Sequence, residues 1–246
     1  VLPHKDWLSN MIQPLLDHKK VVGVETLRYK YDKNLSLLDR YFALYGAGDP
    51  LAFYLGKADR LSYLYETYNL LGESGDMGKY YLVKFKQNHI PTLGANGFLI
   101  RRDILMKHAM VDDEHFYHID VNVDLINKGY NIYAFVKNDI IHLTGYKDIS
   151  NFLYRRKLFM EQFHFKKYSS RRYSVFMPQD KFKLIVFIIF AITFIKPTFD
   201  AVRGFIKIHD KAWFLHPVLC FGLLSIYAFV TIKHILFAYG ASIFKR

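Results

Sequence analysis

The chain has 246 residues, of which 52% are hydrophobic, so it can form a folded core and is not a disordered tail. Its formal net charge of +12 and sequence pI near 9.5 indicate a negatively charged partner, for which nucleic acid, anionic lipid and nucleotide diphosphate are the candidates. Cys220 is the one cysteine, which excludes an internal disulfide framework and a thiolate metal cluster.

Helical and strand patterns alternate along the first 148 residues, as expected of an α/β domain. The predicted helices cover residues 7–17, 35–44, 101–108 and 117–127, and the predicted strands cover residues 21–24, 80–85, 130–136 and 139–142. Asp49 followed by Pro50 is typical of a helix cap and first helical position, which predicts one more helix there. A role for this segment as a substrate loop is equally open.

A glycine-rich loop joins a predicted strand to a predicted helix. Gly94, Asn96 and Gly97 lie in the string Gly-Ala-Asn-Gly-Phe-Leu-Ile-Arg-Arg, which ends at Arg102. Glycines let a backbone approach a sugar closely, and the Asn96 amide offers donors and an acceptor for hydroxyl groups. The alternative is an ordinary tight turn between strand and helix.

An acidic helix follows the glycine loop. The string His-Ile-Asp-Val-Asn-Val-Asp-Leu begins at His118, and Lys128, Gly129 and Tyr130 close the segment. In this order the two motifs resemble those of family 2 glycosyltransferases, of the membrane-anchored bacterial or archaeal type, and the resemblance extends over nearly the whole chain. It implies a nucleotide-sugar-transferase-like (Rossmann-like) α/β domain, with this chain as the acceptor-side half of an N-terminally truncated enzyme.

The resemblance implies an inverting transfer with a carboxylate base, and Asp120 near the start of the helix is the expected base. The family has Glu-Asp where this chain has Ile119-Asp120, and counting back from Gly129 at the family's spacing reaches His118 instead. Asp124 is a weaker candidate, and an aspartate at a helix start is also a common cap. The residues expected to bind the acceptor are Gly94, Asn96, Gly97 and His118.

A divalent metal, Mg or Mn, is expected to hold the donor diphosphate. The resemblance places most of its ligands in an Asp-x-Asp pair upstream of Val1, and His142 after a predicted strand is the ligand that this chain would add. Imidazole suits manganese, whereas magnesium prefers oxygen. A histidine that bonds to a neighbour at the end of a strand is the structural alternative.

Basic side chains gather on a predicted amphipathic helix over residues 151–167. The resemblance assigns Arg155 and Arg156 to the donor diphosphate, while anionic lipid headgroups are the alternative partner. The string Gln-x-x-Arg-Trp of the processive polysaccharide synthases is absent from the sequence, so processive synthesis is not expected.

Two apolar runs, residues 184–195 and 212–232, contain no charged side chain. They predict transmembrane helices over about 183–199 and 212–232, with the loop 197–211 outside. The excess of Lys and Arg before the first run places the catalytic domain in the cytoplasm. A tilted or re-entrant first helix and an interfacial helix in the loop are the alternatives.

Three segments follow from these patterns: the acceptor-side part at 1–148, a basic juxtamembrane segment at 149–182 and a membrane hairpin at 183–246. The expected function is transfer of a sugar from a nucleotide-sugar donor to a lipid-linked or membrane-proximal glycan acceptor at the cytoplasmic membrane, with this fragment inactive alone. The alternative is a non-catalytic membrane-anchored adaptor that binds anionic lipid or an acidic partner. Nucleic acid is not an expected partner, because the basic residues concentrate beside the membrane segments and match no nucleic-acid module.

Overall fold

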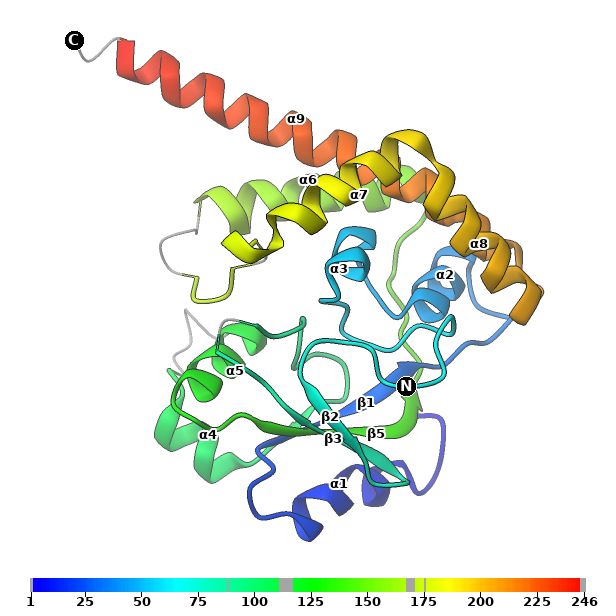
Figure 1. Ribbon diagram of the computed structural model, residues 1–246, viewed down its shortest axis with the longest axis vertical. Coiled ribbons are helices and arrows are strands. Elements are labelled where there is room, and N and C mark those ends of the chain that lie inside the picture. Colours follow the sequence, from blue (N-terminus) through cyan, green and yellow to red (C-terminus); the bar gives the residue numbers. More distant parts are fainter. Residues whose placement is uncertain (1, 88, 111–116, 167–170, 175, 244–246) are drawn as a thin grey trace.

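A five-stranded mixed sheet lies at the centre of the protein (Figure 1). The strands are β1 (Gly23–Tyr29), β2 (Glu73–Asp76), β3 (Tyr80–Lys84), β4 (Leu99–Ile100) and β5 (Ile132–Ile140), in the order β2-β3-β5-β1-β4. β1 and β5 are parallel, and the other neighbouring strands are antiparallel. The structure is a computed structural model that describes residues 2–87, 89–110, 117–166, 171–174 and 176–243. The α/β class predicted from the sequence is confirmed.

β5 is one continuous strand, so the prediction of two strands over residues 130–136 and 139–142 was wrong. Its polar pair Lys137-Asn138 breaks the apolar pattern in the sequence. In the sheet, a register shift between Thr26 and Arg28 of β1 accommodates this pair, and pairing resumes with Arg28 opposite Asp139. A bulge therefore keeps the strand intact.

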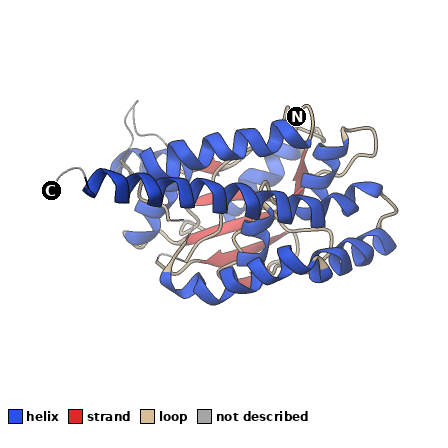
Figure 2. Ribbon diagram, turned by 90° about the horizontal axis from the view of Figure 1, so that it is seen from above, coloured by secondary structure: helices blue, strands red, loops and turns tan. Residues whose placement is uncertain are grey.

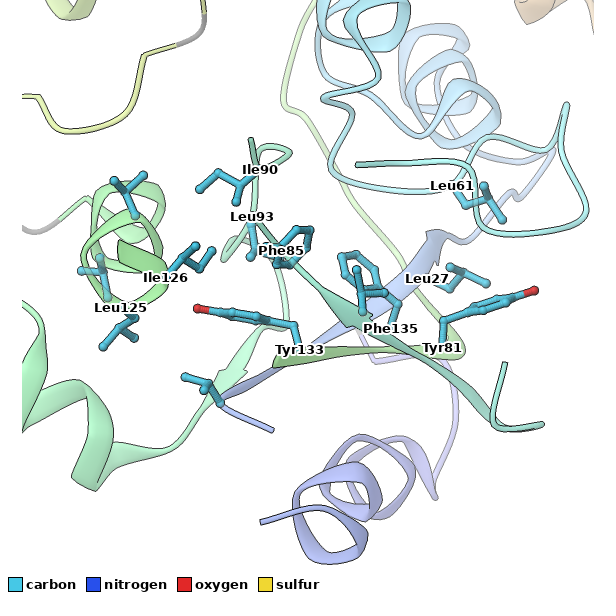
Figure 3. Close-up of a cluster of buried hydrophobic side chains, with 14 residues drawn as sticks. Leu27, Leu61, Tyr81, Phe85, Ile90, Leu93, Leu125, Ile126, Tyr133 and Phe135 are labelled. Carbon is cyan, nitrogen blue, oxygen red and sulfur yellow. The ribbon is translucent and has the colours of Figure 1, made fainter. Parts of the chain in front are cut away.

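Helices cover both faces of the sheet. The helices α1 (Trp7–Asp17), α4 (Arg102–His108) and α5 (His118–Asn127) confirm three of the predicted helices. Trp7 and Met11 of α1 pack on one face. On the other face, Leu125 of α5 lies in one buried cluster with Tyr133 and Phe135 of β5 (Figure 3).

Two capped helices follow β1. α2 (Leu37–Tyr45) begins after Ser36, whose hydroxyl accepts a hydrogen bond from the Asp39 N–H. α3 (Pro50–Leu55) begins after Asp49, whose carboxylate accepts a hydrogen bond from the Leu51 N–H at 2.8 Å. The cap predicted at Asp49-Pro50 is therefore confirmed.

The C-terminal part is helical, and its helices lie over the sheet when seen from above (Figure 2). The helices are α6 (Ile149–Phe159), continued by a π-helix (Met160–Lys166), then α7 (Lys181–Thr193), α8 (Ile195–Lys207) and α9 (Leu215–Ile243). Of the basic helix predicted over residues 151–167, only residue 167 lies outside the described residues. The helix is confirmed over the rest.

The structure has one of the two predicted transmembrane helices as a single long helix and the other as two helices joined by a bend. Lys211–Phe237, which includes most of α9, is by length and composition apolar enough to cross a membrane. The first prediction, a helix over 183–199, is not one straight helix, because Phe194 adopts a left-handed φ of 60° and the chain bends by 79° there. α8 occupies the segment that was expected to be an external loop.

The C-terminal helices share a core with the sheet domain. Phe152 of α6 and Trp213 and Leu219 near the start of α9 are buried in the same cluster as Tyr41 and Phe42 of α2. This cluster contains residues from both sides of the predicted boundary at residue 149. The helices are therefore packed on the α/β domain along its upper side (Figure 1).

Candidate functional site

The glycine-rich loop has a backbone that only small residues adopt easily. Gly94 and Gly97 have φ of 100° and 86°, and Asn96 between them has φ of 44°. A side chain is strained in this left-handed region, although Asn tolerates it better than most residues. The loop leads directly into β4 at the edge of the sheet, next to β1.

A buried ion pair holds this loop in place. Arg60 and Glu25 are both fully buried, with 2.6 Å between Nη2 and Oε1. The other Glu25 oxygen accepts a hydrogen bond from the Gly94 N–H at 3.0 Å, and Arg60 donates to the carbonyls of Asn96 and Ala95 at 3.1 and 3.3 Å. Burial raises the pKa of Glu25 to about 7, against the lowering effect of Arg60.

The loop also touches the start of α5. A Cβ atom placed on Gly94 would lie 2.5 Å from Asn122 Nδ2 and 3.2 Å from the carbonyl oxygen of His118. The Asn122 amide itself donates to the His118 carbonyl at 2.8 Å. The two motifs that carry the family resemblance are therefore in direct contact in space.

Asp59 is a site residue that the sequence analysis missed. Its carboxylate accepts a short hydrogen bond from the Tyr29 hydroxyl, and the Asn96 amide donates to the same hydroxyl at 3.4 Å. The Asp59 charge also acts to raise the pKa of both His118 and His142, although burial lowers both values overall. The sequence Lys-Ala-Asp-Arg around this half-buried aspartate matches no motif that would predict a site residue, since only the fold brings Asp59 to the loop.

Asp120, the expected base, is fully buried in the first turn of α5. Arg171 binds both of its oxygens, with distances of 2.7 Å from Nε and 3.2 Å from Nη2, and the Tyr173 N–H donates to the carboxylate at 2.9 Å. Asp124 is paired in the same manner with Arg172 at 2.8 Å. In this arrangement, the segment that precedes α7 covers the Asp120 carboxylate.

His118 lies at the other side of the same helical turn and is exposed. Partial burial, followed by the positive charge of Arg171, lowers its pKa below the ordinary value of 6.5. The imidazole is therefore neutral at pH 7 and can accept a proton. Of the two residues that the family's spacing offers as a base, His118 is the accessible one in this conformation.

His142, the expected metal ligand, stacks on Tyr29 with 4.7 Å between ring centroids. Among the residues that the structure describes, its buried Nδ1 has no hydrogen-bond partner, and burial lowers its pKa, so a lone pair on the ring is available to a ligand. Within the described residues, no group of three or more His, Cys, Asp or Glu side chains could hold a metal ion. His142 thus fits the role of one added ligand, while the described part of the chain does not form a complete metal site.

Arg155 and Arg156 differ from each other in their contacts. Arg156 donates at 2.9 Å to the Asp49 carboxylate and to the Gly48 carbonyl, so it joins α6 to the start of α3. Arg155 is exposed and lies over the Tyr146 ring at 4.9 Å. Only Arg155 is free of a carboxylate partner among the interactions of these two side chains.

A cavity of about 380 Å³ lies elsewhere, near the carboxyl ends of β1 and β5. Its lining includes no residue of the predicted site. The lining residues are His4, Leu27, Arg28, Tyr63, Glu66, Tyr81, Lys137, Asn138 and Asp139. The contacts among Gly94, Asn96, His118 and Asp59 define the candidate site better than the cavity does, because they join the sequence motifs.

Comparison with family models, curated proteins and solved structures finds no match to the chain.

Proposed function

We propose that the chain is the acceptor-side part of a glycosyltransferase that moves a sugar from a nucleotide-sugar donor to a lipid-linked or membrane-proximal glycan acceptor. The observation that carries the proposal is the contact between the glycine loop and the first turn of α5, where Gly94 lies against His118 and Asn122. A sugar-binding backbone loop beside a proton acceptor is what a transfer to a hydroxyl group needs.

The proton acceptor lies in the first turn of α5. In an inverting transfer it removes the acceptor hydroxyl proton while that oxygen attacks the anomeric carbon, and the bond from this carbon to the diphosphate breaks. Asp120 takes this role if Arg171 leaves its carboxylate, whereas His118 is already exposed and neutral. Asn96 and the backbone of Gly94 and Gly97 orient the acceptor.

The proposal assigns most of the donor-binding site to residues other than those of the glycine loop and α5. β4 at the sheet edge and the parallel pair β1 and β5 are compatible with one half of a Rossmann-like nucleotide-sugar-transferase domain. A bound Mg²⁺ or Mn²⁺ would neutralise charge on the leaving diphosphate. His142, with its unpartnered Nδ1, is the residue of this chain that would help to hold it, and Asp59 lies near the same imidazole.

A membrane-proximal acceptor is supported by the segment Lys211–Phe237, which is long and apolar enough to cross a membrane. We propose that the domain lies at the inner membrane. The expected orientation is with the domain in the cytoplasm. Arg155 is left as a contact to diphosphate or lipid headgroup, because Arg156 is held by Asp49.

The adaptor alternative has one observation in its favour. Asp120 and Arg156, two of the residues expected to act on substrates, are both engaged in ion pairs within the protein. A protein without catalytic activity could use them in this way to stabilise its helical layer.

The test is turnover of a panel of nucleotide sugars by the full-length protein in membranes with Mg²⁺ or Mn²⁺. Asp120→Asn and His118→Ala are compared with Asp103→Asn, a control at an exposed aspartate in the first turn of α4. The variant that removes the base should lose about 10²–10⁴-fold in turnover while it still binds donor, and the control should keep wild-type turnover. Wild-type turnover in both test variants would refute the assignment to this turn, and no turnover with any donor would favour the adaptor.

A further inference from the structure

Three helices present apolar stripes away from the α/β domain. The stripe residues are spaced three or four apart along α7 and α8, and three, four or eight apart along α9, so on each helix they lie on one side. They are between 42% and 75% exposed, and they are Phe182, Ile185, Ile189 and Ile192 on α7, Ile195, Phe199, Val202 and Ile206 on α8, and Val218, Phe221, Phe229, Ile232 and Leu236 on α9. This much exposed apolar surface marks an interaction site.

The opposite face of α8 is bound to the domain by polar contacts. Lys207 donates to the Leu64 carbonyl at 3.1 Å and to the Glu66 carboxylate at 2.7 Å. Asp200 accepts a hydrogen bond from the Tyr54 hydroxyl of α3 at 3.1 Å. α8 therefore lies on the same side of any membrane as the sheet domain.

The turn between α8 and α9 is bound to the domain as well. Asp210 is 2.8 Å from Arg40 and accepts a hydrogen bond from Tyr31 at 2.7 Å, and Trp213 packs edge-on against Tyr45. The first turn of α7 is bound too, since Lys183 donates to the Leu55 carbonyl at 3.1 Å. Because both ends of α7 stay beside the domain, α7 does not cross a bilayer.

α9 also remains beside the domain for most of its length. Near its far end, Lys233 pairs with Glu161 of the π-helix at 3.2 Å, and His234 stacks on Phe165 at 3.8 Å. Residues 235–243 are the part of α9 that extends beyond these contacts.

The neighbour of α9 cannot itself enter hydrocarbon. α6 and its π-helix carry Arg155, Arg156, Lys157 and Glu161 and run beside α9. Charged side chains at the centre of a bilayer are costly. A helix that is packed against this charged neighbour therefore lies along the membrane surface.

We propose that the protein is monotopic, with the apolar stripes of α7, α8 and α9 immersed in one leaflet of an anionic bilayer and no crossing by any of the three helices. Charge complementarity supports this partner, since the exposed Lys181, Arg203 and Lys211 flank the stripes and the chain has a net charge of +12. The proposal is independent of the glycosyltransferase assignment, because it uses only the packing of these helices.

Topology is tested with single cysteines in a Cys220→Ala background of the full chain, expressed in bacterial membranes. Met106→Cys reports the domain, Lys211→Cys reports the turn before α9, and Lys245→Cys reports the C-terminal end. A membrane-impermeant maleimide should label all three from the same side of sealed vesicles. Labelling of Lys211→Cys from the opposite side would establish a two-span hairpin, and labelling of Lys245→Cys from the opposite side would establish a single span; either overturns the proposal.

The lipid partner is tested by flotation of the purified protein with vesicles of neutral phosphatidylcholine or of phosphatidylcholine mixed with phosphatidylglycerol. Phe199→Asp should weaken binding to the anionic vesicles about tenfold or more, because it removes a buried aromatic group from the leaflet. Met106→Asp, an equally exposed position on α4, is the control and should bind like wild type. A soluble dimer that does not float with either vesicle would show that a second copy covers the stripes, and would overturn the proposal.

Discussion

Gly94→Ala tests the contact between the two sequence motifs. The substitution adds a Cβ atom at a residue with φ of 100°, where side chains are strained by about 1–2 kcal/mol. The new atom would also lie 2.5 Å from Asn122 Nδ2, a distance that real Cβ contacts essentially never show. Repacking a tight buried contact costs about 1–3 kcal/mol more, so the total is about 2–5 kcal/mol.

Gly145→Ala is the matched control, because this glycine also has a positive φ, of 67°, and nothing lies within 4 Å of its added Cβ atom. It should lose only the backbone contribution of about 1–2 kcal/mol. Urea unfolding in detergent, followed by far-UV circular dichroism, gives both values from the midpoints. The difference between the two variants isolates the steric contact.

A further substitution identifies the neighbour. In the Gly94→Ala background, Asn122→Ala should cost less than it does in the wild-type protein, because it removes the atom that the new Cβ meets. Equal losses for Gly94→Ala and Gly145→Ala, together with additive effects of Gly94→Ala and Asn122→Ala, would refute the contact between loop and helix.

Arg60→Met should destabilise the fold by about 3–5 kcal/mol because it breaks a buried ion pair. Burial raises the pKa of Glu25 above its unfolded value of 4.5 to about 7, so the stability from the bound proton is present at low pH and is lost as pH rises through about 7. Arg60 lowers this pKa, so its removal makes the ionised carboxylate more costly to bury, and the loss should be larger at pH 8 than at pH 5. Urea unfolding at both pH values checks this, and an equal loss at both would contradict it. Arg156→Ala should weaken the packing of α6 against α3, and amide hydrogen exchange in α6 should become faster. The affinity for the donor should not change. Weaker donor binding would instead support a contact between Arg156 and the diphosphate. Arg171→Ala removes a positive charge that lowers the pKa of His118, so, if His118 is the base, the fall of kcat/KM on the acid side should move to higher pH; an unmoved profile would exclude His118.

Local patterns were enough to predict most helices and the α/β class. The cap at Asp49 and the extent of α1 are determined by residues close together in the chain, so they are visible in the sequence. β5 was missed as a single strand because its polar pair lies in a bulge, where two residues of β5 face one residue of β1. A re-entrant first helix was an alternative in the sequence, but the position of the break was not predicted, because Phe194 adopts a left-handed conformation at a residue that is neither glycine nor proline.

In the candidate site too, features made by neighbouring residues were predicted from the sequence, and contacts between residues far apart in the chain were not. The glycine loop and the acidic helix were both singled out from the sequence, and the structure brings Gly94 to His118. Asp59 and the Arg171 contact with Asp120 were not foreseen, since each joins residues that are far apart in the chain. Arg156 was expected at the diphosphate, but its partner Asp49 is known only once α6 packs beside α3.

The most direct test of the proposed activity is the anomeric configuration of a product made by the full-length protein in membranes from an α-linked nucleotide sugar, determined by proton NMR. The proposal predicts a β-linked product, formed by one direct displacement with a base from the first turn of α5. A product that retains the α configuration would contradict the single-displacement mechanism, and the absence of any glycosylated product across the donor panel would contradict the glycosyltransferase assignment itself.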